Sequence, residues 1–392
     1  MNRRSLHSCP YPAAIAGTAL ACLALLIAAP APPHNLADVP GVVVHHVPSP
    51  SWWQRLRGRA VYTASPSIVV LPNGDYVISS NIFGRGSGAE VSGTTFIHRS
   101  GDRGQTWQHL ATLDGMKRGS LFVLGDTLYL WGYRAAPGDI LIRRSRDGGA
   151  TWTEPKDEAS GLLKKGKFGG TPCIPVVHAG RIWIAQGGKR IMSAPAEADL
   201  LKAESWTLSA AANTDSGPLG KGLTITEAQV VASPRTGVVI LPKIRGKAYT
   251  VLLRAGDRPD QIRQPAAADW VPLPGGEKKF AATYDPVSET FYALSNPVDP
   301  ADAKRGWPPE MVRNTAALLS SQDLRNWRVE RVFLHSPNVD YEAFQYLSFA
   351  IDGEDLVVAS RTAFDMGATK PPRGHDSNLI TFHRIENFRR RE

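Results

Sequence analysis

The sequence predicts an all-β fold assembled from repeated units. Short apolar or alternating runs recur along the 392 residues, separated by turn dipeptides such as Asn73-Gly74. Helical periodicity is hard to find beyond the N-terminal segment, although a short helix is expected at 195–203, which begins with a proline. One pattern, S-x-D-x-G-x-T-W, occurs twice, at 100–107 and 145–152. A pattern that returns after this interval indicates similar modules placed side by side.

Each residue type in the repeated pattern has a physical role in a tight turn. The short carboxylates of Asp102 and Asp147 can accept hydrogen bonds from N–H groups across the turn, and glycine allows a positive φ. The closing tryptophans, Trp107 and Trp152, offer large surfaces to bury between neighbouring sheets. We therefore predict that both aspartates are structural and that both repeats lie on outer turns, away from a central pocket.

The repeated pattern resembles the Asp-box, the hairpin-turn motif of sialidase-like β-propellers. A degenerate third copy at 321–327 keeps the serine, the aspartate and the tryptophan. The resemblance implies a propeller, whose blades are four-stranded sheets. At roughly 50 to 60 residues per blade, the chain accommodates a six-bladed β-propeller. The run at 42–47 is a strand candidate that can close the ring by pairing with the last blade.

The N-terminal residues 1–31 have the features of a secretory signal peptide. Two arginines precede an apolar run at 13–29, which is short for a membrane span and ends in small residues. An uncleaved anchor and lipidation at Cys22 are the alternatives. We expect residues 32–60 to form an N-terminal segment with the closing strand. Residues 61–392 are then the sialidase-like propeller.

Composition limits the partners and cofactors. The formal net charge is +9, but the lysines and arginines are scattered, so no nucleic-acid partner is expected, and a basic surface suits an acidic glycan. Beyond the signal segment the chain keeps only Cys173, which excludes an intrachain disulfide. No nucleotide or metal motif appears, so we predict no cofactor and structural roles for His45, His46 and His383. We expect an exported monomer, periplasmic or extracellular, without stable membrane insertion.

The second half of the chain resembles exo-sialidases at four positions that follow the order of that family. Glu227 stands at the head of a predicted inner strand, and Arg245 follows after a hairpin's length. Arg313 precedes the third repeat, and Tyr346 lies on the next inner strand, ahead of an Asp-Gly turn. The resemblance implies that Tyr346 is the catalytic nucleophile with Glu227 as its base partner. The two arginines would bind the carboxylate of the substrate.

These residue types suit the chemistry of a sialic acid, whose anomeric carbon carries a carboxylate. An anionic nucleophile would be repelled there, whereas a tyrosine stays neutral until a neighbouring glutamate accepts its proton. Arginine binds a carboxylate through a planar fork of N–H groups, a role that lysine fills poorly. Taken singly, a strand tyrosine usually belongs to the core and an arginine after a strand usually faces solvent. Their joint order raises the functional interpretation to equal weight.

An independent cluster lies near the C-terminus. Arg361 ends a predicted strand, and His375-Asp376 opens the next one. A histidine beside an aspartate and facing an arginine can transfer a proton or recognise a substituent of an acidic sugar. The alternative is a hydrogen-bonded closure of the last blade. We place His375 among the candidate catalytic residues, and Arg361 and Asp376 among the candidate substrate-binding residues.

The first half of the chain departs from exo-sialidases. Ala64 stands where the family has an arginine on the first inner strand, and the acid aspartate of the family is missing. Asp75 and Glu90 are the nearest carboxylates. Because a carboxylate held by fewer arginines loses charge-assisted hydrogen bonds, we expect weak or no action on ordinary sialosides.

Three functions are compatible with these residues. The leading hypothesis is an exported glycoside hydrolase of the sialidase-like class that acts on the non-reducing end of an acidic glycan. The second is a uronate-type polysaccharide lyase on the same fold, with His375 and Arg361 carrying the reaction. The third is a non-catalytic carbohydrate-binding propeller.

Overall fold

The structure of the protein is a computed structural model, which describes residues 35–85, 93–135, 137–215, 217–303, 306–367 and 370–390. The expected signal peptide, with Cys22, and the candidate carboxylate Glu90 lie outside the described residues. The chain from His34 to Glu392 forms one compact unit. Within the described ranges, no helix is long and apolar enough to cross a membrane.

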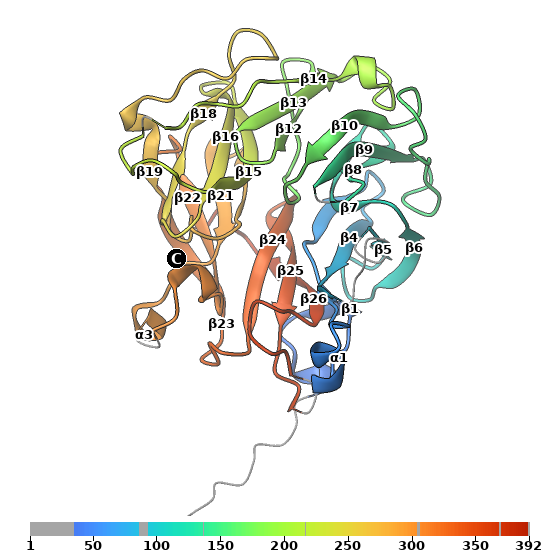
Figure 1. Cartoon of the computed structure of the whole chain (residues 1–392), viewed down its shortest axis with the longest axis vertical. Helices are drawn as coiled ribbons and strands as arrows, with labels where there is room; N and C mark the ends of the chain where they lie inside the picture. The colour runs from blue at the N-terminus through green and yellow to red at the C-terminus, as the bar shows by residue number, and fades with distance from the viewer. Residues whose placement is uncertain are drawn as a thin grey trace, which may run out of the picture. The chain divides into compact units, whose positions relative to one another are not determined.

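The strands are grouped in six blades of a β-propeller, as the sequence predicted (Figure 1). The first two blades contain β2 (Tyr62–Thr63), β3 (Ser67–Val70), β4 (Tyr76–Phe83), β5 (Thr95–Ser100) and β6 (Gln108–Leu113), then β7 (Lys117–Leu124), β8 (Thr127–Tyr133), β9 (Gly138–Ser145) and β10 (Leu162–Phe168). The next two contain β11 (Val176–His178), β12 (Arg181–Gln186), β13 (Arg190–Pro195) and β14 (Thr207–Leu208), then β15 (Ile225–Ser233), β16 (Gly237–Ile244), β17 (Tyr249–Val251), β18 (Leu253–Arg254) and β19 (Trp270–Pro272). The last two contain β20 (Ala281–Asp285), β21 (Thr290–Ser295), β22 (Thr315–Ser321) and β23 (Arg328–His335), then β24 (Ala343–Asp352), β25 (Asp355–Ala363), β26 (Leu379–Ile385) and β1 (Val42–His46).

The innermost strands of the six blades are β3, β7, β11, β15, β20 and β24. β3 contacts β7 and β24, β15 contacts β11 and β20, and β20 contacts β24, so the first strands of neighbouring blades touch one another. In most blades the later strands pair outward in sequence order, as in β7-β8-β9-β10, whereas the fourth blade is split into the sheets β15-β16-β18 and β17-β19. Residues at the start of these inner strands are therefore brought close together, although they are far apart in the chain.

β1 completes the ring from the other end of the chain. It pairs antiparallel with β26, with Val42 opposite Phe382 and His46 opposite Leu379. The sheet order β1-β26-β25-β24 gives the last blade its fourth strand from the N-terminal segment. This pairing covers an edge that would otherwise be free, and it is the closure that the run at 42–47 predicted.

The two sequence repeats form the turns between the third and fourth strands of the first two blades. In both, the aspartate carboxylate accepts a hydrogen bond at 2.9 Å from the N–H of the threonine four residues later. The glycine N–H donates to the serine Oγ at 2.8 Å in both turns. Hydrogen bonds, first from the Thr106 hydroxyl, lower the pKa of Asp102 to about 2. Burial acts upward on the pKa of Asp147, but the same bonds bring it to about 2. Both aspartates are turn residues, as predicted.

The tryptophans that close the repeats are partly rather than fully buried. The Trp107 ring lies 5.4 Å from the Phe382 ring, centroid to centroid, and so joins the first blade to the last. Nε1 of Trp152 donates to the carbonyl oxygen of Gly149 at 2.8 Å. Trp107 therefore supports the contact between two blades, and Trp152 supports its own turn.

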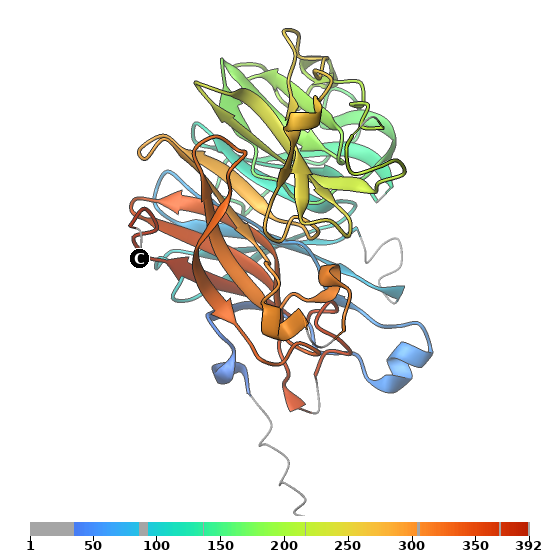
Figure 2. The ribbon, with the colours of Figure 1, turned by 90° about the vertical axis from the view of Figure 1, so that its left-hand side faces the viewer.

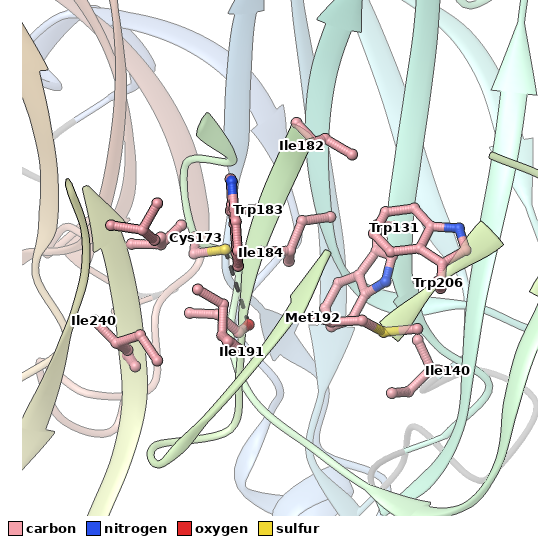
Figure 3. Packing of buried hydrophobic residues seen from close by; sticks show 14 of the residues in the cluster. Trp131, Ile140, Cys173, Ile182, Trp183, Ile184, Ile191, Met192, Trp206 and Ile240 are labelled. Carbon is pink, nitrogen blue, oxygen red and sulfur yellow. Dashed lines mark hydrogen bonds between the residues drawn. The ribbon is translucent and has the colours of Figure 1, made fainter. Parts of the chain in front are cut away.

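The helix expected at 195–203 does not form. β13 continues to the proline of this segment, and the residues that follow make turns before the 3-10 helix Ala203–Ser205. Pairing with β12 along the whole of β13 outweighs the local preference for a helix start. Trp206, directly after, is buried in the cluster between blades that Figure 3 shows, together with Trp131 and Met192.

Two short α-helices occur in the described part of the chain, and neither was expected. They are α1 (Trp52–Leu56) and α3 (Pro300–Ala303), and both lie outside the sheets (Figure 2). The side chain of Ser51 caps α1 by accepting a hydrogen bond from the N–H of Gln54 at 3.3 Å. The fold thus positions its polar residues mainly through strands and their connections.

Candidate active site

Three inner strands carry the same irregularity near their first residues. The pairing register shifts near the start of β7, β15 and β24, and within each shift one non-glycine residue has a left-handed backbone. These residues are Arg118, Glu227 and Tyr346, with φ of 55°, 53° and 53°. A bulge re-aims a side chain, and a left-handed conformation costs a non-glycine residue on the order of 1–3 kcal/mol. Three alternate blades therefore hold strained residues at equivalent positions.

These three side chains line one cavity of about 580 Å³. Its other walls come from β16, from the segment before β20 and from the β21–β22 and β25–β26 connections, so the cavity lies where the inner strands converge. A smaller cavity of about 160 Å³ shares Arg118, Glu227, Tyr346 and His375 with it and adds Ala64. The repeat aspartates are absent from the described lining of both cavities.

Tyr346 and Glu227 lie within hydrogen-bond distance of each other. The Tyr346 hydroxyl donates to Oε1 of Glu227 at 3.3 Å, and Nζ of Lys243 forms an ion pair with Oε2. Burial acts upward on the pKa of Glu227, but the nearby cations, Lys243 first, hold it below its ordinary value. The carboxylate is therefore ionised at neutral pH and can accept the proton of the tyrosine.

The two arginines expected to bind a carboxylate differ in their setting. Arg313 is 6% exposed, and it donates from Nε to the carbonyl oxygen of Glu310 at 2.9 Å and from Nη1 to Oε1 of Gln345 at 3.0 Å. Its guanidinium carbon lies 5.7 Å from the centroid of the Tyr346 ring. The Arg245 side chain is 67% exposed, with Nε 4.0 Å from a carboxylate oxygen of Glu310. Arg313 is thus fixed beside the tyrosine, whereas Arg245 lies at the rim.

Arg361 is buried beneath the tyrosine. Its guanidinium carbon lies 4.4 Å from the centroid of the Tyr346 ring and 4.7 Å from that of Phe83, and it donates to the carbonyl oxygen of His375. Burial lowers its pKa to about 10, so it stays charged at neutral pH. Arg361 lines only the smaller cavity, where it holds the ring of Tyr346 in place.

His375 lines both cavities, whereas Asp376 lines neither. Nδ1 of His375 lies 2.8 Å from Oδ1 of Asp376, and Oδ2 accepts a hydrogen bond from Nε of Arg373 at 3.0 Å. Burial lowers the pKa of His375 to about 4 against the upward effect of Asp376. The imidazole is therefore neutral at pH 7, and an Nδ1–H donated to Asp376 leaves Nε2 as the nitrogen that accepts a proton.

Four charged residues of the larger cavity were missed by the sequence reasoning: Arg118, Lys243, Glu277 and Glu310. Glu277 is 3% exposed, its Oε1 accepts a hydrogen bond from Nζ of Lys278 at 2.5 Å, and its Oε2 has no partner among the described residues. Lys243 precedes Arg245 on the same hairpin, so strand alternation offered a signal for it. The only signal for Arg118 in the sequence was its place as a polar residue at the head of an inner strand.

Other residues weighed from the sequence have structural contacts. Asp75 lies at the β3–β4 turn and accepts a hydrogen bond from Nε of Arg99 at 2.7 Å, so it serves that turn. Nε2 of His383 lies 2.7 Å from Oγ1 of Thr381 on the same strand. Across the residues that the structure describes, no group of three or more His, Cys, Asp or Glu is placed to hold a metal ion.

Comparison with known proteins gives matches among solved structures. No protein-family model matches the sequence, and no curated protein matches it. The chain is similar to the α-L-arabinanase of Penicillium chrysogenum, with 14% identity, a TM-score of 0.52 and coverage of 90% of this chain and 99% of that one. It is similar to the α-L-arabinofuranosidase of Fusarium graminearum, with 11% identity, a TM-score of 0.55 and coverage of 88% and 97%. It is also similar to the leech intramolecular trans-sialidase, with 11% identity, a TM-score of 0.56 and coverage of 89% and 70%. At this level of identity, the likeness shows a shared propeller fold.

Proposed function

We propose that the protein is an exported glycoside hydrolase of the sialidase-like class, which removes a sugar from the non-reducing end of an acidic glycan. The observation that carries the proposal is the Tyr346–Glu227 pair, 3.3 Å apart in a cavity of about 580 Å³. The proposal is supported by the similar solved structures, which are named as an arabinanase, an arabinofuranosidase and a trans-sialidase. Export is proposed from residues 1–31 of the sequence alone.

In the proposed reaction, Oη of Tyr346 attacks the anomeric carbon while its proton passes to Oε1 of Glu227. The bond from that carbon to the leaving oxygen breaks, and the leaving oxygen takes a proton from the solvent side of the cavity. Water then attacks the anomeric carbon and releases one proton to solvent, the bond from that carbon to Oη of Tyr346 breaks, and Glu227 returns its proton to the phenolic oxygen. Lys243 supports the first step because it keeps Glu227 ionised.

An acidic substrate is proposed from the charges that line the larger cavity. Four cations face three carboxylates there: Arg118, Lys243, Arg245 and Arg313 against Glu227, Glu277 and Glu310. The methyl group of Ala64 leaves room in the smaller cavity where an arginine side chain would stand. We propose a sugar other than the common sialosides, since that wall offers no guanidinium from the first inner strand.

The test of the hydrolase is turnover of chromogenic or fluorogenic aryl glycosides by the purified protein, with a sialoside beside uronides, arabinosides and deoxy-sugars. Tyr346→Phe removes one hydroxyl and is expected to lower turnover by at least about a hundredfold while leaving sugar binding largely intact. The control, Tyr129→Phe, removes a hydroxyl from a ring that stacks on Phe122 at 5.1 Å, outside both cavities. Full activity of Tyr346→Phe would remove the tyrosine from the mechanism.

A uronate lyase is the second candidate, and the His375–Asp376 pair favours it. Nε2 of the neutral imidazole would take the proton next to a uronate carboxylate. The electrons of that bond form a carbon–carbon double bond, the bond to the leaving oxygen breaks, and this oxygen is protonated. The unsaturated product of a lyase absorbs ultraviolet light, whereas hydrolysis forms no such product. A uronide that yields this absorbance with wild type but not with His375→Asn would select the lyase, and glycan binding without any product would select a binding propeller.

A further inference from the structure

We infer that Arg118 is the specificity-determining residue of this site, and that it binds an anionic substituent of the substrate, a carboxylate or a sulfate ester. The inference rests on the proposed function only in taking the ligand to be a glycan bound in the larger cavity. The sequence pointed instead to Arg245 and Arg313 for the anion. The geometry of the cavity assigns the larger part of this role to Arg118.

The backbone at Arg118 is built like the backbone at the two proposed reactive residues. Its φ of 55° matches the 53° of Glu227 and of Tyr346, and all three occur within a register shift at the head of an inner strand. Oδ1 of Asn81 accepts the N–H of Arg118 at 2.6 Å, and Asn81 is itself 2% exposed and bonded through Nδ2 to Oγ1 of Thr95 at 2.7 Å. A buried polar side chain thus holds the strained conformation that aims the arginine into both cavities.

Of the two arginines held inside the larger cavity rather than at its rim, Arg118 has more free donors than Arg313. Lys243 and Arg245 each face a glutamate as an ion-pair partner. Arg313 donates to a carbonyl oxygen and to an amide oxygen. Arg118 donates only from Nη1 to the carbonyl oxygen of Gly170, at 3.0 Å, and no described carboxylate forms an ion pair with it. A guanidinium has five N–H donors, so Arg118 keeps a fork for a planar or tetrahedral oxyanion.

The surroundings of Arg118 favour a ligand that brings its own negative charge. Arg118 and Lys117 both line the smaller cavity, where the short side chain of Ala64 leaves space beside them. The carboxylate that lines this cavity, Glu227, is already paired with Lys243. An anion placed here would gain a partner without displacing one, whereas a neutral sugar would offer the guanidinium hydroxyl oxygens but no opposite charge.

The chain offers a matched pair of variants to test the inference. Arg103 also has a left-handed backbone, with φ of 59°, but lies in the outer turn of the first repeat with its side chain 66% exposed. Arg118→Gly and Arg103→Gly each remove a guanidinium at a position whose φ glycine accepts readily. Neither variant is expected to lose much thermal stability. A large drop in melting temperature of Arg118→Gly alone would show a structural role and would overturn the inference.

The binding experiment uses calorimetric titration of the full chain at low ionic strength. The probes are N-acetylneuraminate, D-glucuronate, D-galacturonate and D-glucose 6-sulfate, with D-glucose and D-galactose as neutral partners. Wild type is expected to bind at least one acidic probe more tightly than the neutral sugars. Arg118→Gly is expected to lose about tenfold or more of that affinity, Arg118→Lys to lose less, and Arg103→Gly to match wild type. Affinity for the neutral sugars is expected to stay the same in every variant.

Three outcomes would overturn the inference. They are that wild type binds no acidic probe more tightly than the neutral sugars, that Arg118→Gly binds the acidic probes as tightly as wild type does, and that Arg118→Gly loses acidic and neutral sugars equally. The proposed hydrolase fails separately, through the aryl glycoside assay. If Arg118→Gly loses the acidic probe but wild type cleaves no glycoside, the hydrolase is wrong and the anion site stands.

Discussion

The outer turns of the propeller and the cavity ends of its inner strands use the same residue types to different effect. Each place holds a carboxylate, Asp102 or Glu227, and an arginine whose backbone is left-handed, Arg103 or Arg118. In the first turn, Asp102 bonds to Ser100 and to Thr106 within the same short segment, and the largely exposed Arg103 forms an ion pair at the surface with Asp352 at 2.9 Å. In the cavity, Glu227 bonds to a tyrosine that lies 119 residues further along the chain.

The difference lies in where the hydrogen-bond partners come from: the turn residues have a structural role, and the cavity residues are available for function. The turn satisfies its carboxylate within its own segment, so this carboxylate stabilises the turn and is not available to a ligand. The cavity is assembled from several blades and leaves polar atoms unsatisfied, among them Oε2 of Glu277 and most of the Arg118 guanidinium. A buried carboxylate oxygen without a partner is uncommon in folded proteins, and Glu277 lines the cavity that a ligand can enter.

The largest effect is expected when one carboxylate is exchanged in each region. Glu227→Gln removes the proposed base and is expected to lower turnover of an aryl glycoside by roughly 10²–10⁴-fold. Asp102→Asn is expected to keep turnover near wild type and to lower the melting temperature, because the carboxylate no longer draws together the N–H and hydroxyl of Thr106. Steady-state kinetics and thermal melts of both variants check this. A fully active Glu227→Gln would remove the distinction between the two regions.

A smaller effect is expected from the tryptophans that support the turns. Trp152→Ala is expected to lower the free energy of unfolding by about 2 kcal/mol, below the 3–5 kcal/mol of a fully buried aromatic, because the ring is only partly buried. Trp52→Ala, on helix α1 and 58% exposed, is the control, with an expected change within about 0.5 kcal/mol. Urea unfolding measures both. Loss of sugar binding in a folded Trp152→Ala would show that the turn and the cavity are coupled.

The same contrast explains what the sequence could predict. The turns, the six blades and the closing strand were predictable because their partners lie within a few residues or follow from the repeat. The order of Glu227 and Tyr346 came from a family resemblance, since no local pattern joins residues on different blades. Arg118 was missed because its direction depends on a bulge held by Asn81, which lies 37 residues earlier. The helix at 195–203 was wrong because strand pairing outweighed a local proline signal.

A pH effect on stability is expected where the first and last blades meet. The His98 ring lies between the His45 and His109 rings, with centroids 5.1 and 5.2 Å away. Burial, followed by these two histidines, lowers the pKa of His98 to about 3. The unfolded chain binds a proton there below pH of about 6.5 and the folded chain does not, so stability falls as the pH drops from about 6.5 towards 3. His98→Asn is expected to flatten this fall in urea unfolding between pH of about 7 and 4, and an unchanged slope would contradict the assignment.

The smallest effect is expected from the turn aspartates, in a separate and lower pH window. In the folded protein the pKa values of Asp102 and Asp147 are about 2, against about 3.9 in an unfolded chain. The stability they contribute is therefore present above pH of about 4 and is lost as the pH falls towards 2. Asp102→Asn combined with Asp147→Asn is expected to make this loss shallower and to leave the slope above pH of about 5 unchanged. Acid unfolding measured at low and at high salt checks this. The pKa values of both aspartates are lowered by hydrogen bonds and not by paired charges, so salt is expected to change the difference between the variants only slightly. If the double variant instead changed the affinity of the cavity for an acidic sugar, the outer turns could no longer be regarded as purely structural.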